Sequence, residues 1–163
     1  MTVDLNKNEG IAMTIDYSVI RANIALLLNQ QRLATLATMS QESPYCNLVA
    51  FTPSDDLRMI FFSTPTASTK YTNIVNNPNV SLLIDSRTKS GSDAQTGMAV
   101  TVLGSVVQDL QQDIDALKGQ HAGRHPQFKD FIYSPDCAFI QIRVQRYILV
   151  SSLRDVSVLE ISK

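Results

Sequence analysis

Hydroxyl side chains and one lysine are concentrated between residues 61 and 73, where the sequence reads Phe-Phe-Ser-Thr-Pro-Thr-Ala-Ser-Thr-Lys-Tyr-Thr-Asn. A predicted strand ends in this stretch, and a short helix that Pro78 stops begins in it. Backbone N–H groups at a helix start, hydroxyl donors and an ammonium group can together bind a phosphate. The stretch from Thr64 to Lys70 therefore predicts an anion site. The residues alone equally allow a simple helix cap beside a solvated Lys70.

Two histidines, His121 and His125, have the spacing that places two imidazoles on one face of a helix, as in a metal pair. Gly119, Gly123 and Pro126 argue against a stable helix there, and no third ligand is identifiable. We expect a solvated loop and no metal site. No arrangement of Ser, His and Asp predicts a nucleophilic triad either.

The two cysteines, Cys46 and Cys137, lie far apart in the sequence. Their spacing fits neither a disulfide framework nor a cysteine metal site. We expect both to be small buried residues.

The elements that must position these residues are mostly strands. Asp16 is predicted to cap a helix whose apolar residues recur near 3.6 spacing, and a further helix is expected at 111–119. Strands are expected at residues 33–39, 44–52, 57–63, 80–84, 98–107, 137–152 and 156–161. In the strand at 137–152 the apolar residues change face near Arg146, which predicts a bulge or a change of neighbour. Short hairpins without a βαβ rhythm indicate a mainly β fold with accessory helices, an antiparallel barrel.

Composition limits the class of protein. Hydrophobic residues make up 44% and charged residues 18% of the 163 residues, which is typical of a globular chain. We expect one domain over 1–163, with 1–15 flexible and 85–97 a mobile loop. The formal net charge of −1 gives no cationic field for nucleic acid or an anionic membrane. Without a membrane span or a signal peptide, the cytoplasm is the expected compartment.

The order strand, turn, strand, followed by Ser-Thr-Lys-Tyr-Thr-Asn-Ile-Val-Asn-Asn-Pro-Asn-Val-Ser-Leu-Leu at 68–83, resembles the pyridoxamine 5′-phosphate oxidase-like family of FMN-binding split β-barrels. The resemblance covers about residues 32–107, and the final strand with Arg-Tyr-Ile-Leu-Val at 146–150 is also similar. It implies an antiparallel split β-barrel and a homodimer with FMN sites at the subunit interface.

The resemblance and the anion pattern together assign the FMN contacts. The expected cofactor-binding residues are Asn47, Leu48, Val49, Phe62, Ser63, Thr64, Ser68, Thr69, Lys70 and Arg146. Lys70 is expected at the phosphate, and Arg146 is expected to reach a flavin held mainly by the other subunit.

Three departures from the family pattern bear on activity. Asn47 stands where the true oxidase has an arginine, and Thr69-Lys70 replaces an Arg-Lys pair. Arginine binds phosphate bidentately and asparagine does not, so FMN would be held less tightly unless Arg143 or Arg146 substitutes. The oxidase's C-terminal substrate motif has no counterpart, so vitamin B6 oxidation is not expected.

Three functions remain open from the sequence. The first is an FMN-dependent oxidoreductase acting on an unassigned small molecule with an unassigned electron donor, in which the flavin carries the chemistry and no catalytic side chain is assigned. The second is a non-catalytic flavin carrier or redox sensor, and the third is a barrel that binds haem or no cofactor. Reduction of bound flavin by a nicotinamide cofactor or another donor would separate the first two.

Overall fold

The computed structural model describes residues 16–87, 97–107, 113–151 and 155–161. The segment expected to be flexible, 1–15, lies outside the described residues, as does most of the loop expected at 85–97. Within the described ranges, no helix is long and apolar enough to cross a membrane.

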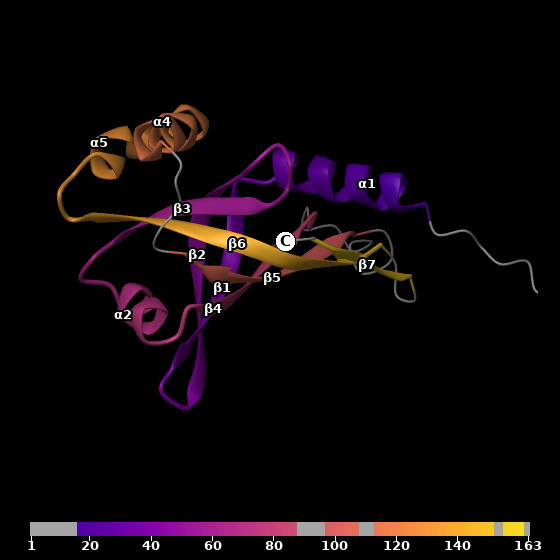
Figure 1. Cartoon of the computed structure of the whole chain (residues 1–163), viewed down its shortest axis with the longest axis horizontal. Helices are drawn as coiled ribbons and strands as arrows, with labels where there is room; N and C mark the ends of the chain where they lie inside the picture. Colours follow the sequence, from indigo (N-terminus) through magenta and orange to yellow (C-terminus); the bar gives the residue numbers. More distant parts are fainter. Residues whose placement is uncertain (1–15, 88–96, 108–112, 152–154, 162–163) are drawn as a thin grey trace, which may run out of the picture.

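Antiparallel strands form the larger part of the described secondary structure (Figure 1). Their bounds are β1 Leu33–Ser40, β2 Ser43–Pro53, β3 Met59–Pro65, β4 Asn79–Asp85, β5 Ala99–Val106, β6 Cys137–Val150 and β7 Val156–Glu160. They follow the order β3-β2-β1-β4-β5-β6-β7, and β3 also pairs with β6. That pairing closes the first six strands of this order into a barrel, to which β7 is added. The predicted antiparallel split barrel is therefore confirmed.

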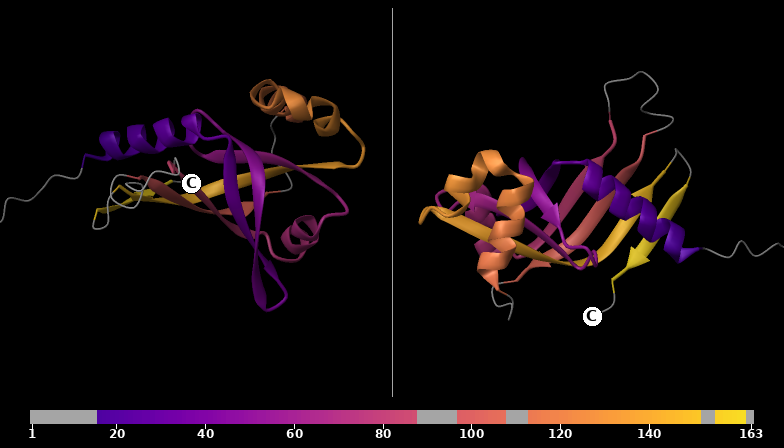
Figure 2. Two further views of the ribbon diagram at one scale, coloured as in Figure 1. Left: turned by 180° about the vertical axis from the view of Figure 1, so that it is seen from behind. Right: turned by 90° about the horizontal axis from the view of Figure 1, so that it is seen from above.

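The helices pack against the barrel at different places. Their bounds are α1 Tyr17–Gln30, α2 Thr69–Asn76, α4 Ile114–Arg124 and α5 Lys129–Ile132, with a short 3-10 turn at Pro126–Phe128. Asp16 caps α1 as predicted, because its side chain accepts the Ser18 N–H at 2.9 Å. Figure 2 shows α1 lying across the sheet at one end and α4 with α5 at the other.

The main core fills the inner face of the sheet, and α1 covers it. Four buried side chains of α1, at Ile20, Ile24, Leu27 and Leu28, join the apolar cluster of the barrel. The largest fully buried side chains include Phe51, Phe62 and Tyr147. Burial of this inner face supplies the main driving force for folding.

A β-bulge lies between β5 and β6. Leu103 pairs with Arg146, but Gly104 pairs with Val144, so Gln145 is an extra residue in β6. The inward side chains of β6 consequently change from even to odd positions, and Arg146 points outward. The change of face that the sequence predicts for this strand thus has its physical cause in the bulge.

A second, smaller core lies under α4 and α5. It contains Phe61, Phe139 and Ile132, with Phe61 and Phe139 stacked at 6.0 Å between ring centroids. His121 and His125 are each 1% exposed and face this core. The prediction that His121 and His125 lie in a solvated loop is therefore wrong.

The helix α4 continues through both of its glycines to Arg124. Burial of His121 and Ala122 against the sheet offsets the low helix propensity of Gly119 and Gly123. Pro126 does not interrupt the helix, because it lies beyond the last residue and starts the 3-10 turn.

Arg124 joins α4 to the end of α1. Its Nη2 group donates to the carbonyls of Leu28, Asn29 and Gln31 at 2.7–3.2 Å. These carbonyls belong to the helix end and the residue after it, where acceptors lack partners within the helix. The guanidinium also lies 5.8 Å from the centroid of the Phe51 ring. One side chain thereby ties both helical layers to the sheet.

The cysteines differ from expectation. Cys46 is exposed, and Cys137 is half-buried. Cys46 lies on the outer face of β2 opposite Ala37 of β1, where no helix covers it. The expectation that both are buried is wrong for Cys46.

Gly104→Ala is expected to destabilise the protein by about 1–3 kcal/mol, because overpacking forces the backbone to shift. A Cβ at this position would lie 2.6 Å from the Arg143 carbonyl oxygen and 2.7 Å from Cγ2 of Ile142. Urea unfolding measures the change. The control is Gly123→Ala, where nothing lies within 4 Å and an alanine favours the helix. Equal stabilities of the two variants would contradict the close-approach account.

Stability is expected to fall by about 1–2 kcal/mol between pH 7 and pH 5 because His121 must stay neutral. Burial, with a contribution from His125 and Arg124, lowers the pKa of His121 to about 4. A depressed pKa gives stability above the unfolded value near 6.5 that is lost as pH falls toward 4. His121→Asn, which does not titrate, should flatten this slope in urea unfolding. An unchanged slope would show that another group is responsible.

Candidate functional site

The start of α2 brings together the central residues of the predicted anion site. Thr64, at the end of β3, lies 3.0 Å from Ser68 between their hydroxyl oxygens. Ser68 caps the helix by accepting the Tyr71 N–H at 3.3 Å. Among the described residues, the backbone N–H groups of Thr69 and Lys70 make no backbone hydrogen bond. Two amides without a backbone hydrogen bond and one half-buried lysine thus belong to the first turn of α2.

A buried hydrogen bond fixes α2 to the β1–β2 hairpin. The Asn73 amide nitrogen donates to the Thr38 hydroxyl at 3.0 Å, and both side chains are buried. The Thr38 hydroxyl in turn lies 3.3 Å from the Tyr45 carbonyl. Sequence reasoning missed this contact, because nothing local in the sequence links residues 35 positions apart.

Asn47 lies near this contact. Asn47 pairs with Leu36 across the hairpin, and the next inward-facing pair is Thr38 with Tyr45. Its Oδ1 atom is buried and, in the described part of the chain, has no hydrogen-bond partner. Buried polar atoms are usually paired, so this oxygen is a site that a bound group could satisfy.

Leu48 points to the opposite face of β2 and is 69% exposed. The Phe51 N–H donates to the Arg32 carbonyl. Because hydrogen-bonded pairs alternate along an antiparallel ladder, the backbone groups of the odd-numbered residues of β2 point to β1. The backbone groups of Leu48 consequently point to the other edge, which β3 covers only from Phe51 to Pro53. Leu48 therefore offers free backbone donors and acceptors rather than a side chain.

Val49 and Phe62 contribute their side chains to the core. They are 5% and 0% exposed. Only their backbone could contact a ligand.

Ser63 is separated from the hydroxyl pair because alternation along β3 sends it to the other face from Thr64. Its hydroxyl is buried beside the Cys137 thiol and has no other partner in the described structure. Burial raises the pKa of that thiol, although Ser63 and Lys118 act in the opposite direction. The thiol is therefore not an activated nucleophile.

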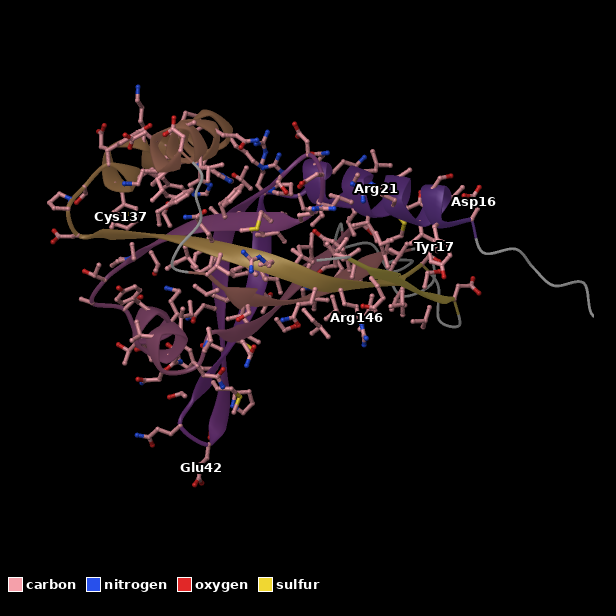
Figure 3. The ribbon with its side chains drawn as sticks, in the orientation of Figure 1. Asp16, Tyr17, Arg21, Glu42, Cys137 and Arg146 are labelled. Carbon is pink, nitrogen blue, oxygen red and sulfur yellow. The ribbon has the colours of Figure 1, made fainter. Side chains whose placement is uncertain are left out.

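Arg146 lies far from α2 within the same chain. It is on the outer face of β6 (labelled in Figure 3) and forms an ion pair with Glu160 at 2.7 Å. Cys137 of β6 pairs with Pro65 just before α2, and Arg146 lies nine residues further along β6, about 30 Å away along the strand. One chain alone does not bring Arg146 to the start of α2.

The two histidines connect the C-terminal end of α4 to β2. Thr52 Oγ1 lies 2.8 Å from Nδ1 of His121, and His125 Nε2 donates to the Phe51 carbonyl at 2.8 Å. Burial lowers the pKa of both. No group of three metal-ligating side chains occurs in the described ranges. Their role there is to anchor α4 to β2.

The residues present fit a phosphate. Lys70, the amides of Thr69 and Lys70, and nearby hydroxyls form a donor set at a helix start, and the unpaired Asn47 oxygen lies on the adjacent hairpin. Bound FMN would supply hydride or electron transfer.

Comparison with known proteins gives the family. A family model described as pyridoxamine 5′-phosphate oxidase matches residues 20–151. No curated protein matches the chain.

Several solved structures share the fold. General stress protein 26 of Bacillus anthracis is 20% identical over 87% of this chain and 98% of its own, with a TM-score of 0.68. A haem-binding protein of Mycobacterium smegmatis is 18% identical over 83% of this chain and 56% of its own, with a TM-score of 0.73. An FAD-binding protein of Mesorhizobium loti is 17% identical over 78% of this chain and 91% of its own, with a TM-score of 0.61.

The family match covers most of the chain, and the barrel described above has the same architecture as these structures. The chain therefore belongs to the pyridoxamine 5′-phosphate oxidase-like family of split β-barrels.

Proposed function

We propose that this protein binds FMN and is a flavin-dependent oxidoreductase acting on a small molecule. The observation that carries the proposal is the donor set at the start of α2, where Lys70 and two unpaired amides adjoin the Thr64–Ser68 hydroxyl pair. Such a set suits a terminal phosphate monoester. Family membership and the FAD-binding protein of Mesorhizobium loti support a flavin.

The flavin would lie along the open edge of β2. The backbone of Leu48 and the Asn47 oxygen offer hydrogen-bonding groups that the described chain leaves without partners. Lys70 orients the phosphate, and the strand edge orients the rest of the molecule. No side chain that moves a proton is assigned, in keeping with chemistry carried by the cofactor.

Haem is the second ligand suggested by the comparisons, because the Mycobacterium smegmatis protein binds it. An axial ligand must be free to reach iron. His121 and His125 are buried and hydrogen-bonded to Thr52 and Phe51, so they do not meet this condition. The site favours a flavin. A non-catalytic flavin carrier would use the same contacts.

A homodimer completes the proposal. One cross-strand row of outward residues, the outer row, crosses the sheet from β2 to β7. Its members are Leu48, Thr35, Leu83, Thr101, Ile148 and Val158. Leu48, Leu83 and Val158 are 69%, 39% and 41% exposed.

The outer row has the size of a protein interface. Its five strand spacings extend about 24 Å, comparable to one side of a standard interface. The exposed apolar side chains of Leu48, Leu83 and Val158 along it are the kind of surface that marks an association site. A second copy on this face would bring a partner's Arg146 into the interface, because Arg146 lies in the next row.

Lys70→Ala is expected to weaken FMN binding by about 1.5–3 kcal/mol, roughly ten- to a hundred-fold, because a charge-assisted contact is lost. Riboflavin lacks the phosphate and should bind both proteins equally. Fluorescence titration with both flavins measures the effect. Lys129→Ala, on exposed α5, is the matched control. Equal FMN affinity in a folded Lys70→Ala variant would remove Lys70 from the site.

The wild-type protein is expected to sediment as a dimer of its 18.0 kDa chain at micromolar concentration. Leu83→Arg, in the middle of the outer row, should give a monomer, since burying an unpaired charge is costly. Leu26→Arg on the exposed side of α1 should leave the dimer intact. A monomeric wild-type protein, or a dimeric Leu83→Arg variant, would refute this interface.

A further inference from the structure

An open cleft lies where α1, the turn between β2 and β3, and the end of β7 meet. It has a volume of about 380 Å³ and is lined by Arg21, Asp56, Arg58, Glu160 and Ile161. Arg21 is on α1 (Figure 3), and α1 and α2 lie on opposite sides of the barrel in Figures 1 and 2. The cleft is separate from the start of α2.

The acidic side chains of the cleft already have partners. Asp56 Oδ1 accepts the Ser54 hydroxyl at 2.6 Å and the Arg58 N–H at 3.0 Å. Glu160 forms its 2.7 Å ion pair with Arg146. Although burial acts in the opposite direction, its hydrogen bonds and the charges of Arg58 and Arg21 lower the pKa of Asp56, so neither carboxylate needs a ligand to balance it.

The two arginines are less fully engaged. Arg21 Nη2 donates to the Asp56 carbonyl at 2.6 Å, and Arg58 Nε lies 3.9 Å from Asp56 Oδ2, beyond hydrogen-bond distance. A guanidinium carries five N–H donors. Most donors of this pair have no acceptor within the described part of the protein.

The turn that carries Arg58 is rigidly held. Leu57 has a φ of 62°, a rare value for a bulky residue, and its side chain is 2% exposed. The Tyr147 hydroxyl, itself buried, donates to the Leu57 carbonyl at 2.8 Å, and the Met59 N–H donates to Ser54 Oγ at 2.9 Å. These contacts fix the backbone next to Arg58.

We propose that this cleft binds a small phosphate-type oxyanion between Arg21 and Arg58. Arginine binds oxyanions bidentately, and two guanidiniums with spare N–H donors line this cleft beside the Asp56 and Glu160 carboxylates. Inorganic phosphate and a phosphate monoester share this chemistry. The proposal does not depend on flavin binding, because Lys70 and α2 take no part in it.

The test follows the backbone amides by NMR while inorganic phosphate is added to the full chain, with sodium chloride of equal ionic strength as reference. Saturable shifts are expected at residues 54–58. Arg21→Gln and Arg58→Gln should each weaken phosphate binding about tenfold or more. Glu160→Gln removes a negative charge from the cleft and should strengthen phosphate binding.

Lys70→Ala and Arg143→Gln are the controls. Lys70→Ala removes the cation of the proposed flavin site, and Arg143 is an exposed cation on β6. Both should leave the shifts at 54–58 unchanged. Arg58 makes no side-chain hydrogen bond in the described structure, so Arg58→Gln tests the site even where Arg21→Gln perturbs the fold. Shifts equal to those in chloride, or confined to α2, would overturn the proposal. Glycerol phosphate in place of inorganic phosphate then distinguishes the monoester.

Discussion

At Gly104 the backbones of β5 and β6 come so close that a Cβ would lie 2.6 Å from the Arg143 carbonyl oxygen. This contact accompanies the bulge that places Gln145 outside the ladder. The first half of β6, from Cys137 to Arg143, pairs with β3 and closes the barrel. A straight β6 would keep one parity of side chains along its whole length and would turn Tyr147 and Leu149 away from the core. Barrel closure and core continuity thus depend on one glycine contact.

The wall of the closed barrel separates two apolar cores. The inner face with α1 forms the main core, and α4 with α5 covers a second core on the opposite face. Arg124 connects the two through the carbonyls at the end of α1. α2 packs Ile74 into the main core and is tied to the hairpin by Asn73 and Thr38. The main core therefore helps to position the proposed ligand site at the start of α2.

Charge acts locally in this protein. The net charge is close to zero, so the proposed anion sites depend on particular groups of side chains rather than on a general field. The start of α2 offers helix amides with one lysine, whereas the cleft at the β2–β3 turn offers one guanidinium from that turn and one from α1. The first arrangement depends on a helix dipole and the second on charge and geometry. These are two physically distinct ways of holding a phosphate group.

The sequence by itself determined the strand pattern, the α1 and α2 caps, the change of face in β6 and the grouping of Thr64, Ser68 and Lys70, because each rests on neighbours close in the chain. It also supported the family. Only the tertiary structure decided that His121 and His125 are buried, because the packing of α4 on β2 offset the helix-breaking glycines. It likewise separated Ser63 and Arg146 from α2, since strand pairing and not spacing along the chain sets which side chains meet. The Arg21–Arg58 cleft was invisible in the sequence for the same reason, as its walls come from α1, a hairpin turn and β7.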